Sequence, residues 1–159
     1  TFYMNEGEFG VCSRNLELLE TEGNTFWKVA RELDLENKLK DKGNICLQGE
    51  LIGEGIQGNP YKIKGQTVRF FTGFDIDKYQ RISFPELVVM LSDMGLQYVP
   101  ILNQELGFVL PETVEDMLKY AEAKSVLNDK TEREGVVIRS MDGTISFKAI
   151  SNKFLLNEK

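Results

Sequence analysis

Two apolar stretches, NICLQGELIG (44–53) and TVRFFTGFDI (67–76), decide the fold of this chain. Both are rich in the apolar and aromatic residues that favour strands, so we predict that they belong to a central sheet. The overlapping segment GELIGEGIQGNPYKI (49–63) places two acidic residues among four glycines. Glycine lets the backbone turn sharply and lets a ligand come close, whereas a carboxylate accepts hydrogen bonds from a sugar or holds a cation. This segment therefore predicts a ligand site.

Turn residues predict a hairpin near each end of the chain. Asn-Glu-Gly at 5–7 supplies the positive backbone angle that a tight turn needs, between the strand-like TFYM and EFGVCS. Met-Asp-Gly at 141–143 gives the same signal between EGVVIRS and TISFKAIS. Both ends of the chain are therefore expected to form antiparallel pairs of strands.

Capping residues predict three helices between these hairpins. Asn24 is placed to cap a helix that begins with Phe-Trp. Ser83 and Glu86 form a capping box that starts the helix SFPELVVMLSDMG. Thr113 and Asp116 give a second such signal, which starts a helix through TVEDMLKYAEAK.

Strands outnumber these helices, and neighbouring strands form hairpins. We therefore predict an α+β domain of mostly antiparallel sheets, with peripheral helices and a groove between the sheets. A chain of 159 residues, 42% of them hydrophobic, is long enough to bury one core. We expect a single domain over residues 1–159.

Composition excludes several classes of function. No run of about 18 apolar residues occurs and the start does not resemble a signal peptide, so we expect a cytoplasmic protein without a membrane span. The net charge of −6 argues against a surface coated with positive charge, but it leaves room for a local basic groove. The sequence has no histidine, which removes the commonest zinc ligand and the usual catalytic triads. Cys12 and Cys46 lack metal-ligand spacing; reduced core thiols are the simplest interpretation, and a disulfide is the alternative.

Five residues beside the predicted strands carry groups suited to chemistry: Glu50, Phe74, Asp75, Glu134 and Lys148. Each has a structural explanation when taken alone. The glutamates suit solvent-facing strand ends, Lys148 suits the polar side of an edge strand, and Phe74 suits the core. Their combination favours a shared site.

The order of these segments resembles the covalent nucleotidyltransferase superfamily of RNA ligases, DNA ligases and capping enzymes, and in particular the nick-sealing RNA ligases. EFGVCSRN is similar to motif Ia of that family, LQGELIGEGIQGNPYK to motif III, VRFFTGFDI to motif IIIa, EGVVIRS to motif IV and SFKAISNKFL to motif V. The motifs occur in the family's order and span almost the whole chain. The resemblance implies a ligase-type nucleotidyltransferase domain, here an adenylyltransferase domain, with a nucleotide-binding groove.

Such a ligase attaches AMP from ATP to a lysine, transfers it to a polynucleotide 5′-phosphate, and lets a 3′-hydroxyl displace the AMP. The resemblance implies that Glu50 binds the nucleoside ribose and that Phe74 stacks on the adenine, with Asp75 supporting the site from the same strand end. Attack at phosphorus requires positioned cations, and the resemblance gives this role to Arg14 and Lys148. Glu134 would help to hold Mg²⁺ or Mn²⁺.

The expected partners are ATP or AMP and RNA, or a nicked duplex that contains RNA. We expect the loop GIQGNPY, with Asn59, to lie near the ligand or the nucleic acid, and Gly49 and Gly53 to leave room beside Glu50. Some related ligases carry a second motif V lysine two residues after the first, where this chain has Ile150. Lys153 is the candidate for that phosphate contact.

The sequence lacks the nucleophile motif Lys-x-Asp-Gly, and it begins just after the place where that motif would end. We therefore expect a fragment that is inactive without the upstream lysine. Two alternatives remain open: a catalytically inactive module that binds nucleotide or RNA, and a capping guanylyltransferase. The sequence leaves open the natural substrate (nick, hairpin or hybrid) and the oligomeric state.

Overall fold

The computed structural model describes residues 1–103 and 107–157. They form two compact units. The N-terminal unit comprises Thr1–Gln57 and Ile63–Val99, and the C-terminal unit comprises Gly58–Lys62 and Pro100–Lys159. The short segment Gly58–Lys62, which follows the motif III strand, thus belongs to the C-terminal unit.

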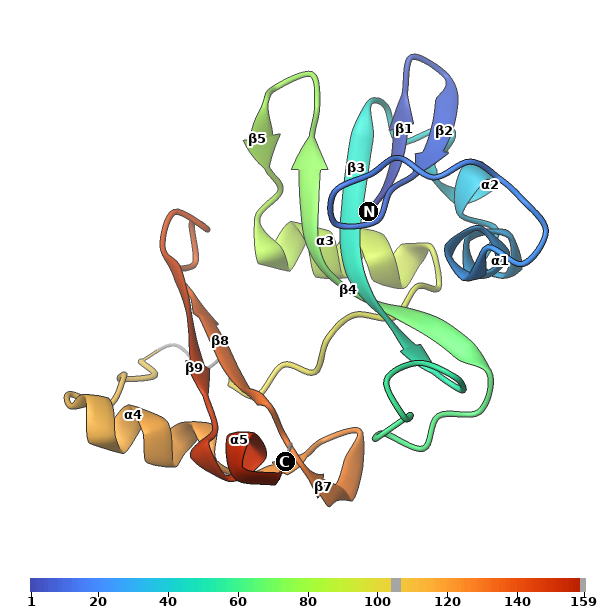
Figure 1. Ribbon diagram of the computed structural model, residues 1–159. Coiled ribbons are helices and arrows are strands. Elements are labelled where there is room, and N and C mark those ends of the chain that lie inside the picture. Colours follow the sequence, from blue (N-terminus) through green and yellow to red (C-terminus); the bar gives the residue numbers. More distant parts are fainter. Residues whose placement is uncertain (104–106, 158–159) are drawn as a thin grey trace. The chain divides into compact units, whose positions relative to one another are not determined.

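The N-terminal unit is built on one antiparallel sheet with the strand order β2-β1-β3-β4-β5 (Figure 1). Its strands are β1 (Phe2–Asn5), β2 (Glu8–Val11), β3 (Ile45–Gly53), β4 (Gln66–Asp75) and β5 (Gln80–Arg81). The two apolar stretches of the sequence form the long central pair, β3 and β4. The predicted turn joins β1 to β2, with positive φ at Glu6 (50°) and Gly7 (83°).

The register of β3 against β4 contains a β-bulge. Gly49 pairs with Phe70 while its neighbour Gln48 pairs with Thr72, so Phe70 and Phe71 together oppose one residue of β3. A bulge adds a residue to one strand and so changes which face its later side chains occupy. After this point the alternation of β4 is reversed.

Three helices of this unit, α1 (Thr25–Glu32), α2 (Leu35–Leu39) and α3 (Phe84–Asp93), pack against one face of the sheet. The core joins Trp27 of α1, Leu35 of α2 and Leu87 of α3 to Phe2 and Phe70 of the sheet. The caps predicted from the sequence are confirmed: Asn24 accepts from the Phe26 and Trp27 amides, and Ser83 with Glu86 forms the capping box. We call this sheet face the core face, and the opposite one the open face.

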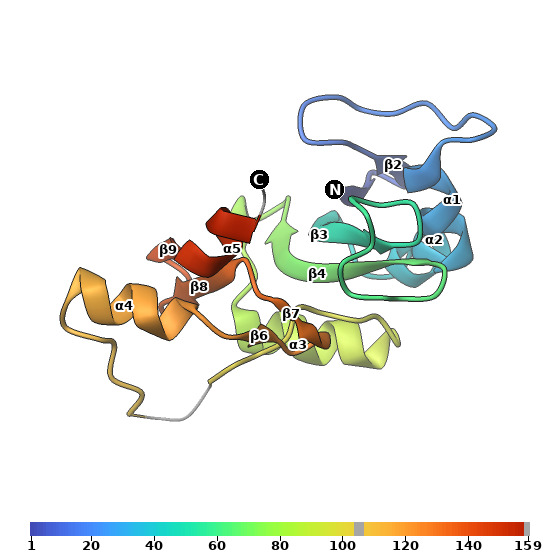
Figure 2. The same ribbon diagram turned by 60° about the horizontal axis from the view of Figure 1, so that its bottom comes forward.

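The C-terminal unit consists of two hairpins and two helices (Figure 2). Its elements are α4 (Val114–Ala121), β6 (Lys124–Ser125), β7 (Asn128–Glu132), β8 (Gly135–Arg139), β9 (Ser146–Ile150) and α5 (Asn152–Asn157). Ala121 of α4 packs with Val136 and Ala149 of the β8–β9 hairpin in a small core. Arg133 donates to the Ala121 and Tyr120 carbonyls at the end of α4.

The third predicted helix is shorter than the sequence indicated. Thr113 caps α4 as predicted, but Glu122 leaves the helical region (ψ 111°) and Lys124 already begins β6. Lys124 pairs with Glu132 in a strand, and this pairing prevents the last helical turn.

The α+β class with antiparallel sheets is confirmed. No helix within the described residues is long and apolar enough to cross a membrane.

Candidate functional site

Strand register places Glu50 and Phe74 on the same face of the N-terminal sheet. Glu50 lies two and four residues beyond Gln48 and Cys46 on β3, so the three side chains share a face. Cys46 pairs directly with Phe74 and therefore brings it to that face. Because Leu47 and Ile45 face the core, this is the open face. Two residues predicted to contact one nucleoside thus project from one surface.

The bulge is the reason that Phe74 reaches the open face. Phe70 is completely buried in the core, and without the extra residue Phe74, four positions later, would point the same way. Phe74 is instead half-buried, and its ring makes an edge-to-face contact with Tyr79 at 5.4 Å between centroids. The part of Phe74 that is exposed is an aromatic surface on which a flat ring could stack.

Asp75 has a structural partner at the end of β4. Its carboxylate accepts from the Lys78 amide at 2.9 Å and forms an ion pair with the Lys78 ammonium at 3.1 Å. The hydrogen bond from the Lys78 amide is the main cause that holds the pKa of Asp75 below its usual value. Both carboxylate oxygens are therefore engaged in the turn between β4 and β5, and a role for Asp75 towards nucleotide stays a prediction.

The glycines beside Glu50 serve close packing of the backbone. A Cβ on Gly49 would lie 2.5 Å from Val68 Cγ1, so the room it leaves is filled by the core and not by the open face. A Cβ on Gly53 would lie 2.1 Å from the Gly65 carbonyl oxygen, at a φ of 125°. The expectation that Gly49 makes room for a ligand is wrong for this reason.

Arg14 follows β2 in the N-terminal unit and is exposed. Among the described residues, it has no hydrogen-bond or ion-pair partner. Its guanidinium is therefore available to a phosphate, but the structure assigns it no contact with the other predicted site residues.

The second pair of predicted residues meets in the C-terminal unit. Glu134 precedes β8 and Lys148 lies on β9, and their side chains form an ion pair while remaining 48% and 45% exposed. Gly135 permits the approach of the two strands, because a Cβ there would lie 2.0 Å from the Ala149 carbonyl oxygen. A carboxylate and an ammonium group thus lie side by side at the β8–β9 hairpin.

Lys153 and Asn59 also belong to the C-terminal unit. Lys153, on α5, forms an ion pair with Glu122 at 3.2 Å, so its ammonium group is already engaged. Asn59 lies in the loop after β3 with a φ of 48°. The next carbonyl, that of Pro60, accepts from Asn128 Nδ2 at 2.8 Å and from Thr131 Oγ1 at 2.9 Å. These contacts fix the loop on β7.

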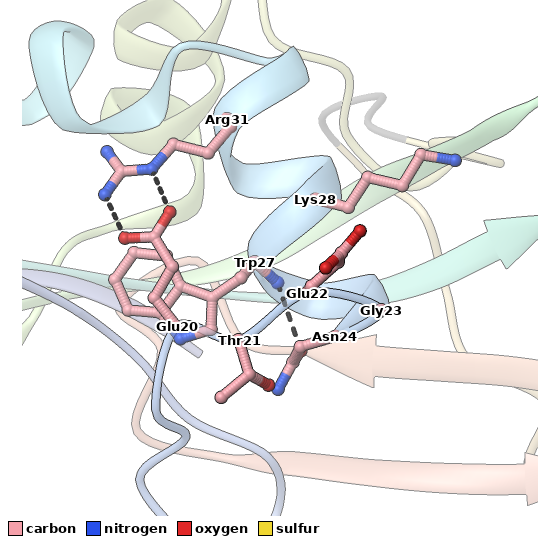
Figure 3. Close-up of a pocket in the computed structure, with 8 residues that line it drawn as sticks. All are labelled: Glu20, Thr21, Glu22, Gly23, Asn24, Trp27, Lys28 and Arg31. Atoms are coloured by element: carbon pink, nitrogen blue, oxygen red, sulfur yellow. Dashed lines mark hydrogen bonds and ion pairs between the residues drawn. The ribbon is translucent and has the colours of Figure 1, made fainter.

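A surface hollow at the start of α1 contains none of the predicted site residues (Figure 3). Its Arg31 forms ion pairs with Glu20 and Glu36 and lies 5.0 Å from the Trp27 ring. These contacts join α1 to the preceding loop through Glu20 and to α2 through Glu36, so they explain the polar lining without a ligand.

The geometry described above can be compared with known proteins. The profile of the RNA ligase family matches residues 1–153. This chain belongs to the RNA ligase family. Among curated proteins there is no significant match.

Solved structures of an RNA ligase from Naegleria gruberi are similar to this RNA ligase chain over 98% of its length. A variant with AMP and Mn matches with a TM-score of 0.90 at 40% identity, and a variant with ATP and Mn with a TM-score of 0.91 at 40% identity. A structure with PPi matches with a TM-score of 0.88. The chain spans about half of these proteins, 47% of each.

The carboxylates of this RNA ligase chain suit a metal site that a bound phosphate helps to complete. Within residues 1–103 and 107–157, no three Cys, Asp or Glu side chains gather in a way that could hold an ion by themselves. Mg²⁺ and Mn²⁺ bound with phosphate substrates commonly take one or two carboxylates and complete their shell with phosphate oxygens and water. Glu134 beside Lys148 fits that arrangement, whereas an all-protein cage does not.

Proposed function

We propose that this chain forms the nucleotide-binding part of an ATP-dependent RNA ligase, which joins a 3′-hydroxyl to a 5′-phosphate through lysyl-AMP and polynucleotide-adenylate intermediates. The observation that carries the proposal is the bulge at Phe70 and Phe71, which brings Phe74 to the open face with Glu50. On that face Phe74 stays half-buried, so a flat base can stack on the exposed part of its ring. The relatives with ATP, AMP and PPi support the same class of ligand.

Phe74 and Glu50 bind the adenosine in this proposal. Phe74 offers an aromatic ring on which a flat base stacks, a contact commonly worth about 1–3 kcal/mol. Glu50 is exposed, and its carboxylate has no hydrogen-bond or ion-pair partner among the described residues. It can therefore accept hydrogen bonds from both ribose hydroxyls, since an ionised carboxylate is an acceptor at each oxygen.

Lys148 and Glu134 act on the phosphates. Lys148 contributes a positive charge to the α-phosphate, where negative charge builds up during transfer. Glu134 helps to hold Mg²⁺ or Mn²⁺, which when bound offsets phosphate charge and favours the neutral form of a lysine nucleophile. In the free protein the two side chains form an exposed, weak ion pair, which would separate so that Lys148 meets a phosphate and Glu134 a cation.

RNA, or a nicked duplex that contains RNA, is the proposed second substrate. Arg14 is exposed without a partner in the described residues, and the loop that carries Asn59 is fixed on β7. A cation and a polar loop that is hydrogen-bonded in place suit contacts to a phosphate backbone. The net charge of −6 predicts that such contacts are local.

Nucleotide binding by the chain tests the proposal directly. We expect ATP and AMP to bind, and Phe74→Ala and Glu50→Ala each to weaken binding of adenosine at least tenfold. Phe26→Ala, which truncates an exposed phenylalanine of α1, is the matched control and should leave binding unchanged. Preference for GTP over ATP would favour the capping enzyme, and no nucleotide binding at all would contradict the proposal.

Adduct formation with labelled ATP tests the chemistry. Residues 1–159 contain no Lys-x-Asp-Gly. We therefore expect residues 1–159 alone to bind ATP without becoming labelled, and a protein that joins them to this motif to form the adduct in the presence of a divalent metal. Equal labelling of both proteins would show that an internal lysine is the nucleophile. Lack of labelling in both would favour the inactive binding module.

A further inference from the structure

Arg69 lies on the open face directly opposite Glu50. The two residues are Cα partners in the β3–β4 ladder, so their side chains leave the sheet on the same side. None of the family motifs described above gives this position a role. Its register alone brings a permanent positive charge into the row of the proposed ribose-binding residue.

The guanidinium of Arg69 is only partly satisfied. Its Nε atom is buried and has no hydrogen-bond partner, and burial lowers the pKa of the group. Although Glu50 is opposite in the ladder, no ion pair joins Arg69 to any residue of the described ranges. Arg31, by contrast, forms ion pairs with two carboxylates, and Arg133 donates to two carbonyls. A buried Nε–H without an acceptor costs free energy, and a bound anion would remove that cost.

The order of residues along the open face indicates which anion would bind Arg69. The row of Cys46 and Phe74 and the row of Glu50 and Arg69 are four residues apart on β3, which corresponds to about 13 Å. A nucleotide whose base stacks on Phe74 and whose ribose contacts Glu50 lies along β3, from the first row to the second. The ribose and the 5′-phosphate attached to it then lie near the row of Glu50 and Arg69, away from Phe74.

We propose that Arg69 binds the phosphate of the nucleotide whose base contacts Phe74 and whose ribose contacts Glu50. This inference rests on the proposed nucleotide-binding function and adds a specific residue to it. Arginine suits the role because its planar fork gives a phosphate two parallel hydrogen bonds. Glu50 is then left to the ribose, since the guanidinium is occupied by the ligand.

The experiment compares the affinities of adenosine, AMP and ATP for the unaltered chain, Arg69→Met and Arg69→Lys. We expect Arg69→Met to weaken binding of AMP and ATP about tenfold to a hundredfold, as for loss of a charge-assisted contact, and to leave adenosine within twofold. The affinities of Arg69→Lys for AMP and ATP should lie between those of the unaltered chain and Arg69→Met, because lysine keeps the positive charge but lacks the two parallel N–H donors of arginine. Thermal unfolding followed by circular dichroism checks that each variant is folded.

Arg81→Met is the matched control. Arg81 pairs with Phe74 and so lies on the same face in the row of the base, where a phosphate is not expected. Equal losses of ATP affinity in the two methionine variants would mean that only the overall charge matters, and would overturn the assignment. Equal weakening of adenosine and ATP by Arg69→Met would also overturn it, because that pattern marks a structural effect.

A 5′-phosphorylated nicked RNA duplex serves as the second ligand. Loss of duplex affinity with unchanged AMP and ATP affinity would assign Arg69 to the polynucleotide and overturn its assignment to the nucleotide. If Phe74→Ala and Glu50→Ala weaken adenosine while Arg69→Met changes nothing, the proposed function stands and the role of Arg69 falls. If the unaltered chain binds neither adenosine nor ATP, both proposals fail.

Discussion

The two units hold their charged candidate residues in opposite ways. On the sheet of the N-terminal unit, Glu50 and Arg69 are opposite in the ladder, yet no ion pair joins them in the described structure. On the hairpin of the C-terminal unit, Glu134 and Lys148 form an ion pair. Exposed ion pairs contribute only about 0–1 kcal/mol, so the pair is readily exchanged for a phosphate and a cation. In the proposed site, therefore, Glu50 and Arg69 can bind a ligand without breaking an ion pair, whereas Glu134 and Lys148 must first separate.

The largest effect is expected from Lys148→Ala. In a protein that also carries the nucleophile, loss of this phosphate contact should reduce adduct formation by at least a hundredfold, as for other groups that stabilise charge in the transition state. Its stability should change by less than about 1 kcal/mol, because the broken ion pair is exposed. Labelling with ATP and urea unfolding measure the two effects.

Lys153→Ala is the control for that variant, since it also removes one exposed ion pair, with Glu122. Adduct formation close to that of the unaltered protein would confine phosphate binding to Lys148. A loss comparable to that of Lys148→Ala would support the second phosphate contact predicted from the sequence. If Lys148→Ala is labelled normally and only its melting temperature falls, Lys148 has a structural role and does not bind phosphate.

Glu134→Gln and Glu50→Gln should separate metal binding from ribose binding. Glutamine keeps the shape of Glu134 but removes the charge that holds a cation, so we expect about a tenfold to hundredfold loss of adduct formation that raised metal partly restores. Glu50→Gln still accepts one ribose hydrogen bond, so its defect should be weaker nucleotide use that metal does not restore. Matching responses in metal titrations would contradict this division of roles.

Asn128→Ala should loosen the loop Gly58–Lys62, which follows β3 in the sequence but belongs to the C-terminal unit. The amide donates to the Pro60 carbonyl and to Thr131 Oγ1, at 2.8 and 3.0 Å. Loss of these bonds should lower the free energy of unfolding by about 1–2 kcal/mol, which urea titration measures. If the loop contacts nucleic acid through Asn59, affinity for a nicked RNA duplex should fall while ATP affinity is retained. Unchanged duplex affinity would remove Asn59 from the interface.

The smallest effect is expected from Asp142→Asn in the turn of the C-terminal hairpin. Hydrogen bonds from Ser140, followed by those from Thr144, lower the pKa of Asp142 from 3.8 to about 2. The folded-state pKa is below the unfolded one, so the carboxylate stabilises the fold above about pH 4 and loses this effect as the pH falls towards 2. Urea midpoints between pH 5 and pH 2 should therefore fall less for Asp142→Asn. Parallel curves for the two proteins would contradict the shift.

Local sequence signals predicted much of the fold. Asn24, Ser83 with Glu86, and Thr113 start helices because capping depends on residues three or four positions apart. Glu6-Gly7 turns the first hairpin for the same local reason. The end of the third helix was predicted too late, because pairing of Lys124 with Glu132 competes with helical hydrogen bonds.

The sequence named most of the candidate residues, but it indicated only part of the contacts that these residues make. The sequence indicated Glu50, Phe74, Glu134 and Lys148; the structure places Glu50 and Phe74 on one face of the N-terminal sheet and pairs Glu134 with Lys148 in the C-terminal unit. It did not indicate Arg69, because an arginine in an apolar strand becomes informative only when its cross-strand partner is known. The engagement of Asp75 with Lys78 also depends on how the turn after β4 closes.

The sequence by itself determined that this chain has an α+β fold with antiparallel hairpins, and it carried the motifs of the RNA ligase family. Both properties follow from short-range patterns of apolar residues, turns and caps. Only the tertiary structure decided that Phe74 shares a face with Glu50 and Arg69, because this depends on Phe70 and Phe71 together opposing Gly49. A shift of one residue in strand register exchanges the two faces of a sheet, and no local pattern in β4 records where that shift occurs.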